Sequence, residues 1–333
     1  MTSRECVIRA IDFKKPDRIP LCVNFNYGLL NSSIRDEVLA AIPSFQTDIM
    51  LVYCGDPQFV PEEEGMNQWG YRYESLGETM GEVTNPPIKD WSQFDAWLKK
   101  APDFSHARRY DTARAARLQN PDKFLIGGIG LIATEMINLR GFGASMEDLY
   151  LERGNVERML DVLYSAAKHA VNGYASAGID AVLSWEDWGL QDRAMVDPKL
   201  WREIFFDRMK ELVALTHSHG MKYVLHSCGY ILDYMDMFIE LGIDVIQQDQ
   251  QLCMGFDKLS KWRGKICFMN PVDVQHSPKM DDGQITEYAH RMAQALGSED
   301  GGFIYMMYAS PAAIGMPARN IVSEIRGFKS ITI

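Results

Sequence analysis

The stretch Met221-Lys222-Tyr223-Val224-Leu225-His226-Ser227-Cys228-Gly229 combines a buried strand with a candidate site. Its apolar run predicts a strand over 221–226, and the glycine ends the segment. Residues two apart on a strand face the same side, so His226 and Cys228 are expected to point into one space. An imidazole and a thiol suit a borderline metal such as zinc, although two ligands alone do not complete a site.

Strands and helices alternate around this stretch. The expected strands cover 18–25, 48–54, 124–130, 179–185, 221–226, 243–248, 265–270 and 302–307. The expected helices cover 156–178, 198–219, 230–242, 252–263, 283–296 and 318–329. Short connections between strand and helix indicate a parallel sheet, and about eight strands favour a closed (β/α)8 TIM barrel over an open doubly wound sheet. A dinucleotide-binding fold is disfavoured, because no GxGxxG follows the first strand.

We expect one barrel domain over residues 1–333, with an N-terminal extension. Residues 70–83 predict a small antiparallel hairpin inserted near one mouth of the barrel. We find no low-complexity linker and no short-period repeat. A length of 333 residues is enough for one large barrel.

The composition narrows the class of protein. A formal net charge of -11 argues against nucleic acid and against acidic membranes as partners, because both attract basic surfaces. The sequence lacks the roughly 18 to 20 apolar residues of a membrane helix, and its start lacks the apolar core of a signal peptide. We therefore expect a cytoplasmic protein. Its six scattered cysteines should be mostly free thiols.

Catalytic residues of a TIM barrel lie at the carboxyl ends of its strands. Candidates at these ends, besides His226 and Cys228, are Asn24, Tyr53, Trp185, Glu186, Trp188, Asp249, Asn270 and Tyr308. Glu186 stands between two tryptophans. It could be a third metal ligand, or a general acid or base with a raised pKa. The alternative is a salt bridge to an arginine of the barrel.

Three aspartates at the same strand ends keep two interpretations open. Asp56, Asp187 and Asp273 could belong to the site, or they could cap the following helix or lie at the surface. By contrast, His217 and His219 stand at the expected end of a helix. We interpret both as structural, because a charged imidazole is favourable at a helix C-terminus.

Several segments resemble the uroporphyrinogen decarboxylase superfamily over nearly the whole chain. They are Ala10-Ile11-Asp12-Phe13-Lys14-Lys15-Pro16-Asp17-Arg18-Ile19-Pro20, His226-Ser227-Cys228-Gly229, Phe238-Ile239-Glu240-Leu241-Gly242-Ile243-Asp244, and Gly301-Gly302-Phe303-Ile304 with Pro317-Ala318-Arg319-Asn320-Ile321. The resemblance implies a (β/α)8 barrel with its pocket at the C-terminal mouth.

Two differences from the known patterns of the superfamily bear on which of its branches this chain resembles. Decarboxylases of this kind carry arginines after the first strand, where this chain has Asn24-Phe25-Asn26-Tyr27-Gly28-Leu29-Leu30. Without those arginines, decarboxylation of a tetrapyrrole is not expected. The His-x-Cys pair is similar instead to the methyltransferase branch, which holds zinc through His, Cys and a second Cys on the last strand. Residues 305–311 contain no Cys, so a remaining ligand would come from Glu186, Asp249, Tyr308 or Cys253.

The resemblance implies a zinc-dependent methyltransferase that moves a methyl group between a small methylated substrate or thiol and a corrinoid carried by a partner protein. His226, Cys228 and Glu186 would bind zinc, and Glu186, Asp249 and Tyr308 would be catalytic. The substrate would contact Asn24, Tyr53, Trp185, Trp188 and Asn270.

Two other functions stay open. One is a metal-free decarboxylase or lyase of a small carboxylic acid, in which Asp48, Asp56 or Asp249 stabilises a cationic intermediate and Arg72 or Arg140 binds the acid. The other is a barrel that binds a ligand without turnover. The resemblance permits a monomer or a homodimer.

Overall fold

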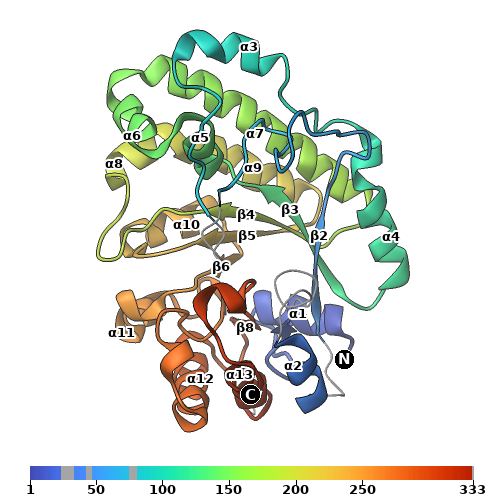
Figure 1. Ribbon diagram of the computed structural model, residues 1–333. Coiled ribbons are helices and arrows are strands. Elements are labelled where there is room, and N and C mark those ends of the chain that lie inside the picture. The colour runs from blue at the N-terminus through green and yellow to red at the C-terminus, as the bar shows by residue number, and fades with distance from the viewer. Residues whose placement is uncertain (24–33, 43–46, 75–80, 332–333) are drawn as a thin grey trace.

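The computed structural model describes residues 1–23, 34–42, 47–74 and 81–331. Its eight strands are all parallel and form one sheet in the order β1-β8-β7-β6-β5-β4-β3-β2. Helices surround the strands (Figure 1). The strands are β1 (Leu21–Cys22), β2 (Ile49–Tyr53), β3 (Phe124–Gly130), β4 (Ala181–Glu186), β5 (Lys222–Ser227), β6 (Val245–Gln247), β7 (Cys267–Asn270) and β8 (Phe303–Met306). The N–H of Asp48 donates to the carbonyl of Leu21 at 2.8 Å and joins the two ends of the sheet. The predicted (β/α)8 barrel is confirmed.

The helices follow the expected alternation, with one interruption. They are α1 (Ser3–Ile11), α2 (Arg35–Ala41), α3 (Phe94–Leu98), α4 (Asp111–Gln119), α5 (Ala133–Arg140), α6 (Phe142–Leu151), α7 (Arg153–Ser176), α8 (Pro198–Trp201), α9 (Asp207–Ser218), α10 (Met235–Leu241), α11 (Phe256–Leu259), α12 (Asp282–Leu296) and α13 (Ala318–Lys329). The helix expected over 198–219 begins as predicted, because the Asp197 carboxylate accepts the N–H of Lys199 and of Leu200. A π-helical turn over Arg202–Phe206 then separates α8 from α9.

The inserted segment at the barrel mouth contains the antiparallel pairing that the sequence predicts. Glu74 and Glu82 exchange backbone hydrogen bonds of 2.9 and 3.2 Å. The turn between them lies outside the described residues. No helix in the described ranges has the length and hydropathy of a membrane span. All six cysteines are free thiols.

Each barrel strand presents one face to the barrel interior and the other to the helices. On β4, Ala181 and Leu183 belong to the interior cluster and Trp185 packs against it. Val182 belongs to the larger cluster between strands and helices. The alternation follows from the two-residue period of a strand. It determines which residues at the strand ends reach the mouth of the barrel.

An aspartate directly precedes β2, β4 and β6 at the amino end of the barrel. Each carboxylate accepts the backbone N–H of a residue in the preceding odd-numbered strand. These contacts join Asp48 to Leu21 at 3.0 Å, Asp180 to Leu125 at 2.8 Å and Asp244 to Tyr223 at 2.8 Å. We call these three residues the base aspartates. They tie β1 to β2, β3 to β4 and β5 to β6.

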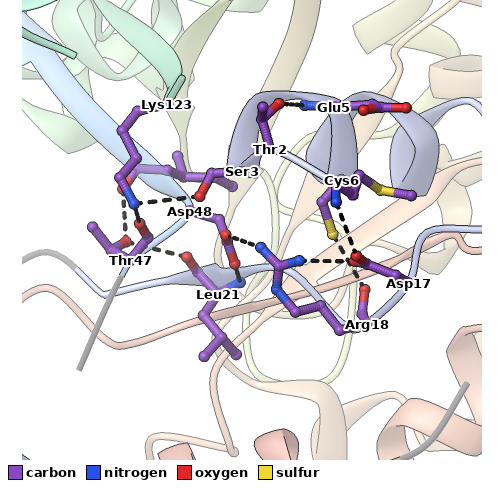
Figure 2. A network of polar contacts seen from close by, with 12 residues as sticks. Thr2, Ser3, Glu5, Cys6, Asp17, Arg18, Leu21, Thr47, Asp48 and Lys123 are labelled. Carbon is purple, nitrogen blue, oxygen red and sulfur yellow. Dashed lines mark hydrogen bonds and ion pairs between the residues drawn. The ribbon is translucent and has the colours of Figure 1, made fainter. Parts of the chain in front are cut away.

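Cationic side chains neutralise all three base aspartates. Arg18 binds Asp48 at 2.6 Å, Arg4 binds Asp180 at 2.7 Å together with Arg117, and Lys222 binds Asp244 at 3.1 Å. Figure 2 shows the first of these groups, in which the Arg18 guanidinium lies between Asp17 and Asp48. The amino end of the barrel is therefore a layer of paired charges, in which Asp48 and Asp180 are buried and their cations reach the surface, as expected for the face that carries stability rather than chemistry.

Candidate active site at the carboxyl ends of the strands

His226, Cys228 and Asp187 bring three different ligand atoms together at the mouth of the barrel. One atom from each lies within 4.8 Å of the other two. His226 Nε2 lies 3.3 Å from Cys228 Sγ and 3.6 Å from an Asp187 oxygen. The arrangement follows from the sheet register, because Trp185 of β4 is the neighbour of His226 of β5. Asp187, two residues beyond Trp185, therefore comes level with Cys228.

Gln247 at the end of β6 orients His226. Its amide oxygen contacts His226 Nδ1, and its amide nitrogen donates to an Asp249 oxygen at 2.7 Å. An amide oxygen only accepts, so Nδ1 carries a proton and Nε2 is left facing Cys228 and Asp187. Histidines that bind metals in proteins commonly donate their other N–H in this way. Sequence reasoning missed Gln247, although it precedes Asp249 by two residues and so shares its face.

Buried charges dominate the electrostatics of this group. Burial raises the pKa of the Cys228 thiol to about 11. Burial disfavours a charged imidazole, but Cys228 and the Asp187 and Asp249 carboxylates raise the pKa of His226 well above its usual value. Burial also acts on Asp187, yet the hydrogen bond to His226 lowers the pKa of that carboxyl. A metal ion here would release the protons of Cys228 and of His226 Nε2, which couples binding to pH.

Asp249 and Tyr308 lie beside the same group, as the sequence suggests. An Asp249 oxygen lies 4.0 Å from Cys228 Sγ, and burial raises the pKa of Asp249. Burial and the charges of Asp249 and Cys228 raise the pKa of Tyr308 to about 12. Asp249 can therefore exchange a proton with a group bound near Cys228, and Tyr308 stays a neutral hydroxyl at neutral pH.

Tyr53 and Trp185 form an aromatic wall on the side of β2 and β3. Their rings stack with centroids 5.8 Å apart and an angle of 19° between their planes. Gly128 of β3 makes this possible, since a Cβ at that position would lie 2.8 Å from the Trp185 ring and 3.0 Å from the Tyr53 ring. The glycine-rich strand thus clears space at the mouth rather than binding phosphate.

Three of the candidate residues point away from the mouth. Both oxygens of Glu186 accept backbone N–H groups, from Ile132 at 3.0 Å and from Ala133 and Thr134 at the start of α5. We expected Glu186 among the metal ligands, but its place beside His226 and Cys228 is taken by Asp187. Burial raises the pKa of Glu186 to about 8, although the three N–H groups lower it.

Trp188 and Asn270 likewise lie on the outer side of the barrel strands, toward the helices. Trp188 is buried between the strands and the helices, with its ring centroid 4.8 Å from that of Phe205 and 5.5 Å from that of Trp201. Asn270 is fully buried, and its side-chain oxygen accepts the N–H of Gln248 at 3.1 Å. With Glu186, these residues have the outward face of their strands. The predicted contact of Asn24 with substrate falls outside the described residues.

The remaining polar candidates have local partners. Asp273 accepts the N–H groups of Leu252 and Gln275, at 2.9 and 3.1 Å. Asp56 accepts the N–H of Gln58 at 2.9 Å and pairs with Arg109 at 3.3 Å. Of the three aspartates with two open interpretations, only Asp187 lies in the group that could hold a metal ion.

Comparison with known proteins fits this geometry. A sequence model described as uroporphyrinogen decarboxylase (URO-D) matches residues 60–301. The chain belongs to the uroporphyrinogen decarboxylase family. The predicted membership of this superfamily is therefore confirmed.

Among solved structures, a methyltransferase from Methanosarcina mazei superposes with a TM-score of 0.70 and 15% identity, over 98% of both chains. Xylanase 10B from Thermotoga maritima has a TM-score of 0.46 and 9% identity, over 98% of both chains. An IOLI protein with a zinc atom has a TM-score of 0.46 and 11% identity, over 93% of this chain and 96% of its own. At such identities, the likeness to the methyltransferase shows a shared fold. Curated protein sequences gave no match.

Proposed function

We propose that this member of the family is a zinc-dependent methyltransferase that moves a methyl group between a small substrate or thiol and a corrinoid held by a partner protein. The single observation that carries the proposal is the convergence of Asp187, His226 and Cys228 at the mouth of the barrel. The fold shared with the methanogen methyltransferase is compatible with it.

The donor set fits zinc. Zinc in proteins is bound by nitrogen, sulfur and carboxylate oxygen, and catalytic sites use three protein ligands with one position left open. In this proposal, Asp187 takes the place of the second cysteine that the methyltransferase branch uses to hold zinc. Zinc, when bound, acts as a Lewis acid on the heteroatom that carries or accepts the methyl group.

The side chains around the group provide the rest of the chemistry. Gln247 holds the imidazole of His226 so that Nε2 faces Cys228 and Asp187. Asp249 lies next to Cys228 and is placed to take a proton from a thiol acceptor or return one to a leaving heteroatom. The stacked rings of Tyr53 and Trp185 offer an apolar surface on one side of the mouth.

A decarboxylase of a small acid is less well supported. The two arginines considered for binding the acid have other partners. Arg140 binds Asp148 and the carbonyl of Lys89, at 2.8 and 2.6 Å, and Arg72 lies near Glu63 and Glu74 at 3.8 and 4.0 Å. A carboxylate substrate would therefore have to displace these partners to bind either arginine.

Metal content tests the proposal directly. The chain should bind about one zinc ion after zinc is added back to chelator-treated protein, as measured by elemental mass spectrometry. His226→Ala, Cys228→Ser and Asp187→Asn should lose the metal, whereas Cys253→Ser and Asp192→Asn should keep it. Loaded protein should then transfer methyl groups from candidate donors to a corrinoid. A wild-type chain that stays metal-free throughout would overturn the proposal.

A further inference from the structure

A small apolar pocket adjoins the mouth of the barrel between the carboxyl ends of β2 and β3 and the helix α7. Its volume is about 150 Å³. Four aromatic residues line it, namely Tyr53, Trp69, Phe104 and Trp185. The helix contributes Leu163 and two alanines to the opposite wall. None of the proposed metal ligands lines this pocket, so it is a separate feature of the molecule.

Small residues on two elements create the space. Gly128 on β3 lines the pocket without a side chain, and it lets the rings of Trp185 and Tyr53 pack against the strand where a Cβ would lie 2.8 and 3.0 Å from them. Ala166 and Ala167 on α7 line the pocket with single methyl groups. An apolar cavity of about 150 Å³ is known to hold one benzene molecule, so the volume corresponds to a single ring.

The lining is neutral. Among the described residues, no Lys, Arg, Asp or Glu lines the pocket. The polar side chain of Gln68 is engaged, because its amide oxygen accepts from Arg109 at 2.8 Å. The backbone N–H of Cys54 donates to the Tyr174 hydroxyl at 2.7 Å. A charged group that entered this pocket would lose its hydration and gain no partner of opposite charge. An aromatic ring could pack edge-to-face or offset against the aromatic wall.

The pocket and the metal-binding group share one wall. Trp185 lines the pocket and is paired in register with His226. A ring bound in the pocket would therefore contact the side chain that neighbours the metal ligands. This places a recognition element for the non-reacting part of a substrate next to the reacting part.

We propose that the pocket formed by Tyr53, Trp69, Phe104, Trp185 and the alanines of α7 binds a single neutral aromatic ring of the substrate. The inference rests on the proposed function and deepens it, because it names the substrate class as small molecules built on one aromatic ring. The ring supplies binding and orientation, and the methyl-bearing or methyl-accepting heteroatom extends from it toward the mouth.

Fluorobenzene, followed by fluorine NMR, tests ring binding without any methyl transfer. Fluorobenzene should bind saturably to the wild-type chain and equally well to the Cys228→Ser variant. Ala167→Met fills the pocket and should weaken binding about tenfold or more. The control Ser165→Met places the same side chain on the exposed side of α7 and should bind like wild type. Absence of saturable binding, or undiminished binding by Ala167→Met, would overturn the inference.

A second variant guards against misfolding of the first. Leu163→Ala enlarges the pocket and should allow binding of 1-fluoronaphthalene, which the wild-type chain should exclude. Failure of a folded Leu163→Ala chain to gain this ligand would count against the pocket as the ring site. Ring binding by a chain that takes up no zinc would refute the proposed function alone, and zinc uptake without ring binding would refute the inference alone.

Discussion

The two ends of the barrel use aspartate in opposite ways. At the amino end, the base aspartates Asp48, Asp180 and Asp244 are each met by an arginine or lysine and by a backbone N–H. At the mouth, the ion pairs of the described residues join Asp187 only to His226, and Asp249 to no Lys or Arg. The comparison teaches that the partner decides the role. A carboxylate that is paired with a cation holds strands together. A carboxylate that faces a histidine and a thiol is available to a ligand.

The largest expected effect on stability comes from the base aspartates at the amino end of the barrel. Asp180→Asn would leave Arg4 and Arg117 facing a neutral amide in a largely buried site, so we expect a loss of about 3 kcal/mol in the free energy of unfolding. Urea denaturation measures it. The matching change at the mouth, Asp187→Asn, should cost less than about 1 kcal/mol, because Asp187 is 48% exposed and pairs with His226 over 3.6 Å. Equal losses for the two variants would remove the distinction between the ends.

Metal affinity should show the reverse order. Cys228→Ser replaces a thiolate donor by a hydroxyl, and we expect zinc affinity to fall by about a hundredfold or more, since removal of a ligand costs at least as much as removal of its support. Competition with a chromophoric chelator measures the affinity. Asp180→Asn, assayed below its unfolding temperature, should bind zinc like wild type. A weakened affinity in Asp180→Asn would mean that the two ends are coupled.

A smaller effect on affinity is expected from Gln247, which touches no metal. Gln247→Leu removes the acceptor of His226 Nδ1–H and the donor to Asp249, so zinc affinity should fall about 10- to 100-fold. The control Gln191→Leu changes an exposed glutamine that contacts Gln275 instead. Nitrogen NMR of the imidazole should report a changed tautomer population in Gln247→Leu. An unchanged tautomer together with unchanged affinity would rule out this positioning role.

The smallest effect concerns a carboxyl that has neither a cation nor a metal. Burial raises the pKa of Glu324 on α13 to about 8, and the Tyr305 hydroxyl donates to its carboxyl group at 2.8 Å. The folded chain then binds a proton that the unfolded chain has lost above its ordinary pKa of 4.5. Stability should therefore fall as pH rises from about 4.5 to 8.

Glu324→Gln should flatten that decline and leave stability near pH 4 almost unchanged. Thermal melts across pH 4 to 9 compare the two chains. The contribution of a base aspartate to stability should depend on pH with the opposite sign. Burial opposes the charge on Asp244, but His217 and the N–H of Tyr223 lower the pKa of this carboxyl, so its contribution is lost only as pH falls below about 3.8. A parallel pH dependence of the Glu324→Gln and wild-type chains would refute the assignment.

The barrel could be predicted from sequence because its alternation of strands and helices is regular. The site could be predicted only in part, and strand parity explains the division. His226 and Cys228 were placed with the two-residue period, and Tyr53, Trp185, Asp249 and Tyr308 share the inward face. Glu186, Trp188 and Asn270 also follow from their place at strand ends, but that place alone ignores the two-residue period, and all three have the outward face.

The same rule would have selected Asp187 over Glu186. Ala181, Leu183 and Trp185 are the uncharged inward residues of β4, and Asp187 continues their series. Gln247 shares the inward face with Asp249, but its residue type alone does not indicate that it contacts His226. Its role depends on the distance between β5 and β6, which no local pattern contains.

The base aspartates also divide the chain into modules. Asp48, Asp180 and Asp244 each bind a strand that directly precedes their own in the sequence, so each contact closes within a two-strand segment of the chain. A break between β2 and β3, or between β4 and β5, would leave every one of these contacts inside a single fragment. A break between β3 and β4 would separate Asp180 from Leu125. Breaks at the even-to-odd connections therefore keep each base aspartate with the strand whose N–H it accepts, but a break between β2 and β3 would part Arg4 from Asp180.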